Sequence, residues 1–371
     1  MQNYVTQTRR ALHQIPELGF DLPKTSAFIQ SELRSFGYDP IVMAKTGVIA
    51  VKKGLSDQAI AFRSDMDALP VVEATTHDFP SLHPGKMHAC GHDGHMTMLL
   101  GFAKSVADLP PFNHTLVFIF QPAEEGPGGA KVLIEEGLFT RFNIRSIFGI
   151  HLFPGLPEGS LGITAGPLMA SAMEFTVTIK GKSAHAAQPH EGQDAIVVAS
   201  QLIQAYQTII SRNRDPLDTA VITIGSIQGG EAPNIIAREV VLKGTVRGFV
   251  PEVMAMIKRR MVEINDGLSA ATQTQITAQL LDAYPAVIND EGLAQAVASG
   301  IALPQAPLKP KMFAEDFSYY QQHVPGLFVF LGTNDDSGNL AYPLHSCYFN
   351  FNESVLLTGI DYYRQVLALM D

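Results

Sequence analysis

Five side chains that can bind a metal or move a proton lie within nine residues. The segment 87–95 reads MHACGHDGH and holds three histidines, a cysteine and an aspartate. Imidazole and thiolate groups are common zinc ligands, and a carboxylate behind a histidine can accept its second ring proton. The segment predicts a metal site that includes Cys90 and His92, with Asp93 or Asp67 orienting an imidazole. Buried histidines are common in cores, but four potential ligands so close together favour metal binding.

Two pairs of carboxylates follow apolar runs of strand length. Asp65 and Asp67 follow one run, and Glu124 and Glu125 follow another. Neighbours in an extended chain point in opposite directions, so one glutamate can bind a metal while the other faces a water. Taken alone, the aspartates are more typical of a capped turn. The glutamates alone are only suggestive, because a helix start also favours acidic residues.

Two histidines stand alone in less polar surroundings. His151 lies in the apolar stretch 149–152, and His345 lies in the segment 343–347. By itself each is typical of a core residue. Their significance depends on whether the fold brings them to the other candidate ligands.

The elements that must position these residues alternate between helix and strand. Helical spacing or strand-like apolar runs occur, in chain order, at 3–13, 24–37, 47–51, 59–62, 94–107, 116–120, 129–137, 327–331 and 353–370. Such alternation predicts an α/β fold with a sheet that is covered on both faces. Ligands of such a sheet bind beyond the strand ends.

The middle of the chain has a different pattern. Strand-like segments at 174–180, 220–227, 239–247 and 274–280 are interleaved with helical patterns at 194–212 and from 251. The order β-α-β-β-α-β is that of a ferredoxin-like unit. We therefore predict an inserted domain over 168–280, within a first domain formed by 1–167 and 281–371.

Composition narrows the function classes. The 371 residues include 26 Lys and Arg against 36 Asp and Glu, a formal charge of −10, which argues against general binding to nucleic acid or anionic membranes. Two cysteines cannot form a disulfide framework, and no segment approaches the ~20 apolar residues of a membrane span. We expect a soluble cytoplasmic protein.

Together these segments resemble the M20 metallopeptidase and amidohydrolase family, in particular its N-acyl-amino-acid amidohydrolases. This branch includes hippurate hydrolases, auxin-conjugate hydrolases and N-acetyldiaminopimelate deacetylases. The resemblance runs from RALHQIPE at 10–17 to the final helix, and HACGHD at 88–93 is a specific signature of the branch. It implies a mixed-sheet metallohydrolase domain whose inserted ferredoxin-like domain serves as lid and dimerisation domain.

The resemblance also implies roles for individual residues. Glu124 would be the general base, and Asp67 would orient a ligand. Divalent ions, two per subunit and drawn from Mn, Zn, Co or Ni, would be held by Cys90, His92, Glu125, His151 and His345. Many relatives outside the branch have His in place of Asp65 and Asp in place of Cys90, which leaves metal number and identity open.

Three residues of the inserted domain match the family's substrate contacts. His185 would bind the scissile carbonyl, often across a dimer. Asn234 and Arg247 would hold the substrate carboxylate, which suits the planar fork of an arginine. Without the resemblance, a hairpin asparagine and a surface arginine would be the simpler interpretation.

The function implied is metal-dependent hydrolysis of the amide bond of N-acyl amino acids by a homodimer. The partner is a small molecule, with no nucleic acid and no membrane involved. Three alternatives remain: a dipeptidase or carboxypeptidase-like metallopeptidase, a metal-independent cysteine hydrolase that uses Cys90, and a non-catalytic binding protein.

Overall fold

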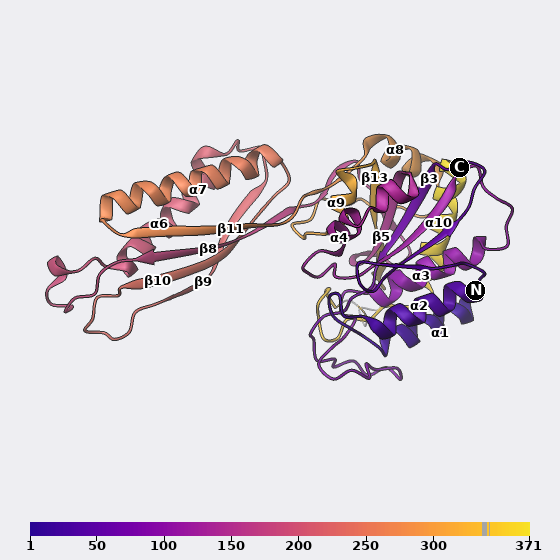
Figure 1. Ribbon diagram of the computed structural model, residues 1–371, viewed down its shortest axis with the longest axis horizontal. Helices are drawn as coiled ribbons and strands as arrows, with labels where there is room; N and C mark the ends of the chain where they lie inside the picture. The colour runs from indigo at the N-terminus through magenta and orange to yellow at the C-terminus, as the bar shows by residue number, and fades with distance from the viewer. Residues whose placement is uncertain (336–339, 341) are drawn as a thin grey trace. The chain divides into compact units, whose positions relative to one another are not determined.

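The computed structural model describes residues 1–335, 340 and 342–371, which form two compact units (Figure 1). Unit 1 comprises Met1–Leu168, Val287–Lys309 and Asp316–Asp371, and unit 2 comprises Met169–Ala286 and Pro310–Glu315. Unit 2 therefore extends beyond residue 280 and takes in a second, short segment. The reason is local pairing, because its last strand runs on to Tyr284 and Lys311 forms a β-bridge with Met169.

Unit 1 is built on a seven-stranded mixed sheet. Its strands are β1 (Ile41–Met43), β2 (Gly47–Lys52), β3 (Ala59–Asp65), β4 (Thr115–Gln121), β5 (Ile144–Pro157), β6 (Leu161–Gly162) and β13 (Gly326–Asn334). They lie in the order β1-β2-β4-β3-β5-β13-β6, with β4, β3, β5 and β13 parallel. The predicted mixed α/β character of this part of the chain is confirmed. Short strands β7 (Gly166–Met169) and β12 (Val287–Asn289) pair separately.

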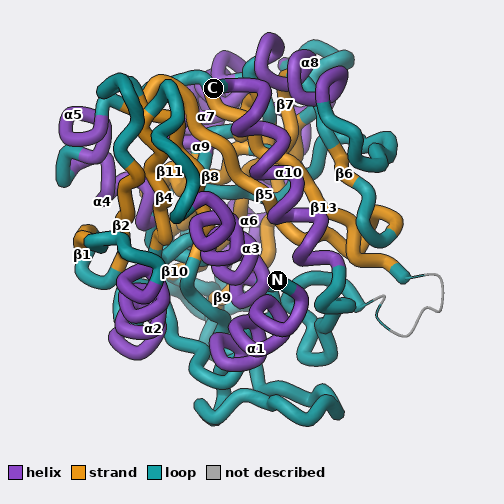
Figure 2. Tube along the Cα trace, turned by 90° about the vertical axis from the view of Figure 1, so that its right-hand side faces the viewer, coloured by secondary structure: helices purple, strands orange, loops and turns teal. Residues whose placement is uncertain are grey.

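Helices cover this sheet because its central strands are apolar on both faces. The helices of unit 1 are α1 (Gln2–His13), α2 (Pro23–Ser35), α3 (His92–Val106), α4 (Gly129–Glu135), α5 (Leu138–Phe142), α8 (Glu291–Gly300), α9 (Ser318–Gln321) and α10 (Val355–Met370). Every residue of β3 and β4 is buried. Phe62 of β3 packs on Phe102 of α3 and Tyr363 of α10, with ring centroids 4.8 and 5.4 Å apart. Helices α3 and α10 lie side by side over the sheet (Figure 2).

The strand register brings the predicted site segments to one edge of this sheet. Asp65 of β3 lies beside Gln121 of β4, and Arg63 of β3 lies beside Gly149 of β5. The carboxyl ends of parallel strands meet at the same edge, where ligands of open α/β sheets bind. The carboxylates that follow β3 and β4 are therefore placed near His151 of β5.

Unit 2 is a four-stranded antiparallel sheet with two long helices. In chain order it contains β8 (Ser171–Lys180), a 3-10 turn (Pro189–Glu191), α6 (Ala195–Thr208), a π-helical turn (Ile209–Asn213), β9 (Ala220–Gly229), β10 (Glu239–Gly248), α7 (Pro251–Thr272) and β11 (Gln275–Tyr284). The sheet order is β11-β8-β10-β9. Phe175, Val177 and Ile179 of β8 are buried in the core with both helices, while the alternating Glu174 is exposed.

In the part of the chain that the structure describes, no helix is both long and apolar enough to cross a membrane.

Candidate metal centre

Two groups of potential metal ligands in unit 1 share one sulfur atom. Cys90 forms one group with His92 and His151, and another with Glu125 and His345. Within each group the ligand atoms lie within 4.8 Å of one another. Cys90 Sγ is 3.5 Å from His151 Nε2, and Glu125 Oε1 is 3.3 Å from His345 Nε2. The structure therefore brings all five predicted ligands together, with the thiol common to both groups.

Hydrogen bonds leave Nε2 of His92 and Nε2 of His151 available for metal. His92 Nδ1 donates to the main-chain carbonyl of Asp67 at 2.8 Å, and His151 Nδ1 donates to the carbonyl of Leu152 at 2.7 Å. A carbonyl can only accept, so each ring carries its proton on Nδ1 and offers the lone pair of Nε2.

Two ligand atoms of this centre are buried without a hydrogen-bond partner. They are His92 Nε2 and Glu125 Oε1, and the contact of the latter is the ion pair with His345 Nε2 at 3.3 Å. Buried polar atoms are normally paired, so each unpaired atom needs an explanation. A divalent transition metal supplies one, since thiolate, imidazole and carboxylate together suit such an ion.

Asp67 holds the two glutamates in place. Its carboxylate accepts the main-chain N–H of Glu124 at 2.9 Å and that of Glu125 at 3.1 Å. Ala123, just before them, has a left-handed φ of 58°, and such strained positions cluster at functional sites. Glu124 is 6% exposed, and its Oε2 lies 4.0 Å from His92 Nε2. The turn thus sets one glutamate among the ligands and the other beside them.

The alternative in which Asp93 orients the imidazole of His92 is wrong. Asp93 instead accepts hydrogen bonds from Arg9 Nε at 3.0 Å and His13 Nδ1 at 2.8 Å. The main-chain carbonyl of Asp67 has the orienting role, which side-chain types alone could not reveal.

The environment of Cys90 disfavours a thiolate nucleophile in the absence of metal. Burial raises the pKa of this thiol well above its ordinary value, and the negative charges of Glu125, Glu124 and Asp65 raise it further. Cysteine nucleophiles depend on the opposite shift, toward a stable thiolate. The cysteine-hydrolase alternative therefore loses its chemical basis, whereas a bound cation would stabilise the thiolate.

His345 is brought to the centre by a strained turn. Its φ is 66°, its main-chain N–H donates to the carbonyl of Ala89 at 2.8 Å, and its side chain is 54% exposed. The bond to Ala89 places this histidine next to Cys90 although more than 250 residues separate them in the chain. No periodic pattern in the sequence could have signalled this contact.

A buried network that the sequence analysis missed supports the centre. His95 Nδ1 donates to Asp65 at 2.7 Å, and His95 Nε2 accepts the N–H of Leu152 at 2.9 Å. Both ring nitrogens are thus used, so His95 positions β5 rather than binding metal. Arg63 donates to Asp65 and Asp316, each at 2.9 Å. The signal in the sequence was a charged pair, Arg63 and Asp65, at the end of the apolar run 59–62.

Removing the arginine of this network should destabilise unit 1 strongly. We expect Arg63→Met to lower the free energy of unfolding by about 3–5 kcal/mol, because two buried carboxylates, Asp65 and Asp316, lose their cationic partner. Denaturant unfolding measures the loss. Arg238→Met is the control, because Arg238 and its partner Glu231 are 70% and 58% exposed and such pairs contribute at most about 1 kcal/mol. Equal losses in the two variants would contradict the assignment.

The predicted substrate contacts of unit 2 fall at two distant places. His185 forms a β-bridge with Ile235, and the N–H of Ala186 donates to the carbonyl of Asn234 at 3.0 Å, so His185 and Asn234 lie on neighbouring segments. Arg247 lies at the other end of β10, which pairs there with the start of β8. Arg247 lies eight positions after Glu239, which is about 27 Å along the strand. Within one chain, Asn234 and Arg247 cannot hold the same small substrate.

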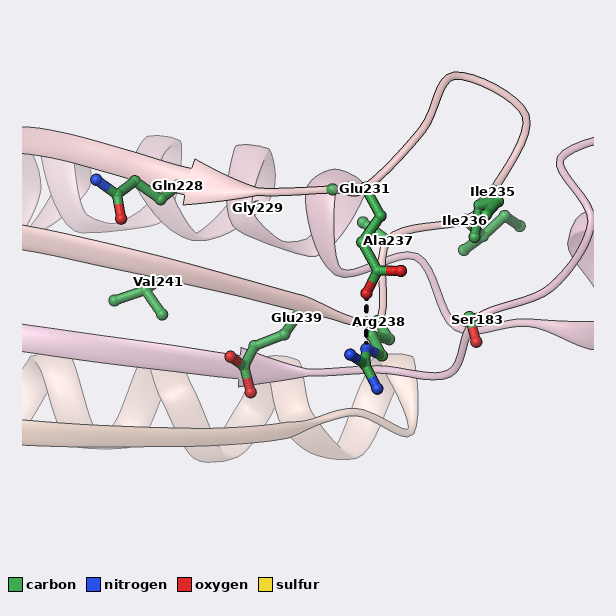
Figure 3. Close-up of a pocket in the computed structure, with 11 residues that line it drawn as sticks. Ser183, Gln228, Gly229, Glu231, Ile235, Ile236, Ala237, Arg238, Glu239 and Val241 are labelled. Carbon is green, nitrogen blue, oxygen red and sulfur yellow. Dashed lines mark hydrogen bonds and ion pairs between the residues drawn. The ribbon is translucent and has the colours of Figure 1, made fainter.

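A cavity of about 270 Å³ lies beside the first of these places (Figure 3). Its lining includes Ser183, Ile235 and Val241, together with the ion pair between Glu231 and Arg238 at 2.9 Å. It contains none of the residues of the metal centre.

Comparison with known proteins places this geometry in a family. The model of peptidase family M20/M25/M40 matches residues 61–369, which include every residue of the metal centre. The chain belongs to this family. As an M20 protein it is a hydrolase.

Individual M20 relatives match over nearly the whole chain. N-acetyldiaminopimelate deacetylase of Listeria monocytogenes serovar 1/2a is 38% identical over 368 residues, which cover 97% of this chain and 98% of the relative. A crystal structure from methicillin-resistant Staphylococcus aureus has a TM-score of 0.94 at 31% identity and covers 100% of this chain and 97% of its own. The crystal structure of a dinuclear metal-binding M20 peptidase of Bacillus subtilis has a TM-score of 0.86 at 32% identity. The match covers 99% of this chain and 97% of that chain.

Proposed function

We propose that this protein is a metal-dependent amidohydrolase that removes the acyl group from N-acyl amino acids. The observation that carries the proposal is the pair of ligand groups that share Cys90 Sγ, with Glu124 beside them. The names of the relatives make an acetyl group the first acyl group to test and diaminopimelate the first amino acid. The similar dinuclear peptidase supports two ions per subunit, and Cys90, His92, Glu125, His151 and His345 would hold them, with Cys90 common to both groups.

Glu124 is the general base in this proposal. Bound divalent ions supply Lewis acidity, which polarises an amide carbonyl and lowers the pKa of water from 15.7 toward about 7. The carboxylate of Glu124 takes a proton from the attacking water and then delivers it to the leaving amine. Asp67 keeps that carboxylate in place through the main chain, and Glu125 remains a ligand.

Unit 2 serves as a lid and dimerisation domain in this proposal, with a ferredoxin-like fold. The separation of Asn234 from Arg247 supports a homodimer in which one subunit supplies Arg247 and its partner supplies His185 and Asn234. Arg247 lies near the point where the chain enters unit 2, since it pairs with Ala172. His185 would donate to the oxyanion that forms on the scissile carbonyl.

A metal-restoration assay tests the proposed reaction. The protein is stripped with a chelator and resupplied with Mn, Zn, Co or Ni, and amine release is followed from N-acetyl, N-benzoyl and longer N-acyl amino acids. N-acetyldiaminopimelate and simple dipeptides complete the panel. We expect release from N-acyl amino acids only after metal is restored. Activity that survives chelation would overturn the proposal, and a preference for dipeptides would establish the metallopeptidase alternative.

Exchange of residues across the dimer can be tested by mixing two inactive variants. We expect His185→Ala to lower kcat by about 10²–10³-fold without changing metal content, because an oxyanion donor is lost. Mixed with Glu124→Gln under conditions that exchange subunits, it should recover about a quarter of wild-type activity. Half of the dimers are then hybrids, and each hybrid has one intact site of two. No recovery despite proven hybrid formation would show that His185 does not act across the dimer.

A further inference from the structure

A further group of potential metal ligands lies in unit 1, outside the centre around Cys90. It consists of His13 at the end of α1 and of Glu73 and His77 in the connection between β3 and α3. None of the three belongs to the ligand groups of Cys90. His13 and Glu73 are almost fully buried, and His77 is only slightly more exposed.

The three side chains converge on one carboxylate oxygen with spacings that suit a metal ion. Glu73 Oε1 lies 3.2 Å from His13 Nε2 and 3.1 Å from His77 Nε2. Ligands about 2.0–2.1 Å from a tetrahedral zinc are about 3.3 Å from one another. In the centre around Cys90, Glu125 Oε1 and His345 Nε2 are likewise 3.3 Å apart, the spacing expected for two zinc ligands. Thr75 Oγ1, 3.0 Å from His77 Nε2, is a fourth polar atom at this point.

Each of the three side chains is fixed by a contact on the side away from the shared Glu73 oxygen. His13 Nδ1 donates to the carboxylate of Asp93 at 2.8 Å, the arrangement that commonly orients a zinc-binding histidine. The second oxygen of Glu73 accepts the N–H of Ser81 at 2.7 Å. The ring of His77 stacks on Phe79 with centroids 3.9 Å apart. The geometry is therefore preorganised rather than a chance meeting of mobile side chains.

The ring of His77 meets its polar neighbours through one nitrogen only. His77 Nδ1 is buried and has no hydrogen-bond partner. Its other ring nitrogen, Nε2, lies 3.1 Å from Glu73 Oε1 and 3.0 Å from Thr75 Oγ1, and the Thr75 hydroxyl donates to the same Glu73 oxygen. An ion bound at Nε2 would offset the cost of burying the Glu73 carboxylate between two imidazoles.

We propose that His13, Glu73 and His77 bind one divalent transition-metal ion such as Zn²⁺, separate from the catalytic centre. The ion ties the end of α1 to the connection that leads from β3 to Cys90. Its role is structural, because Asp93 and the stacked Phe79 enclose the ligands. The alternative is a metal-free ion pair between His13 and Glu73.

Metal counting distinguishes the two possibilities. After saturation with zinc and removal of free metal, we expect His77→Leu to hold one ion fewer per chain than the wild type, measured by mass spectrometry of the metal. His83→Leu is the matched control, because this histidine lies in the same connection but bonds to Lys24 and to the carbonyl of Pro16. It should hold as many ions as the wild type. Equal counts in His77→Leu and the wild type would overturn the proposal.

Cobalt provides a second measurement that does not depend on the catalytic centre. Cys90→Ala should still bind one Co²⁺, with tetrahedral d–d absorption but no charge-transfer band from a thiolate. The double variant Cys90→Ala/His77→Leu should bind none. If His77→Leu does not fold, cobalt binding by Cys90→Ala alone tests for the second site. Failure of Cys90→Ala to bind cobalt would overturn the second site and leave the proposed hydrolase function untouched.

Discussion

Glu124→Gln should lower kcat by about 10²–10⁴-fold while metal content stays unchanged. General-base catalysis typically contributes this factor, and an amide cannot take a proton from water. The substitution nearly preserves side-chain volume. It also retains the main-chain N–H that donates to Asp67 at 2.9 Å. Steady-state kinetics on the substrate found in the panel, together with metal analysis of the same sample, measures both quantities.

The neighbouring glutamate is the matched control for this prediction. Glu125→Gln keeps the same hydrogen bond to Asp67 but replaces a charged ligand that lies 3.3 Å from His345. We expect it to lose bound metal as well as activity. If Glu124→Gln lost metal equally, Glu124 would be a ligand rather than the base, and the proposed division of labour between the two carboxylates would be wrong.

Cys90→Ala should abolish activity through loss of both ions of the catalytic centre. Its sulfur is the one atom that the two ligand groups share, so its removal leaves each group with only two side chains. Loss of a hydrogen-bond partner behind a ligand already costs 10–100-fold in metal affinity, and loss of a shared ligand should cost more. Metal analysis after dialysis should show two ions fewer per chain than in the wild type.

His345→Ala tests whether loss of a ligand that belongs to one group has a smaller effect on bound metal than loss of Cys90, which belongs to both. His345 belongs to only one of the two Cys90 groups, and its side chain is 54% exposed. Its loss should remove one ion and leave the ion held by Cys90, His92 and His151. If Cys90→Ala and His345→Ala lost the same number of ions, the sulfur would not bridge.

The sequence predicted the ligand types because several of them lie in short, distinctive segments. HACGHD places Cys90 and His92 two residues apart, and the structure starts α3 at His92 directly after Gly91, whose φ of 88° favours glycine. Glu124 and Glu125 follow the most apolar strand, so their place at a strand end was visible from hydrophobic pattern alone. Local pattern is reliable here because burial on both faces of a sheet demands continuous apolar runs.

Other elements carried no such signal. β5 has 14 residues, yet the sequence pattern did not predict it, because Gly149 and His151 interrupt its apolar run and its far end is partly exposed. His151 therefore looked like a solitary core histidine. Its role became visible only when β5 was paired with β3 and with β13.

The sequence by itself determined the alternation of helix and strand, the β-α-β-β-α-β order of the middle segment and the kinds of side chain at the strand ends. Only the tertiary structure decided which atoms meet. It showed that Cys90 lies between two ligand groups, that the carbonyl of Asp67 orients His92, and that Asn234 and Arg247 are separated by the length of a strand. The physical reason is that periodicity reports which face of an element is buried. Contacts between distant residues such as Cys90 and His345 depend on strand register and long-range packing, which no local pattern encodes.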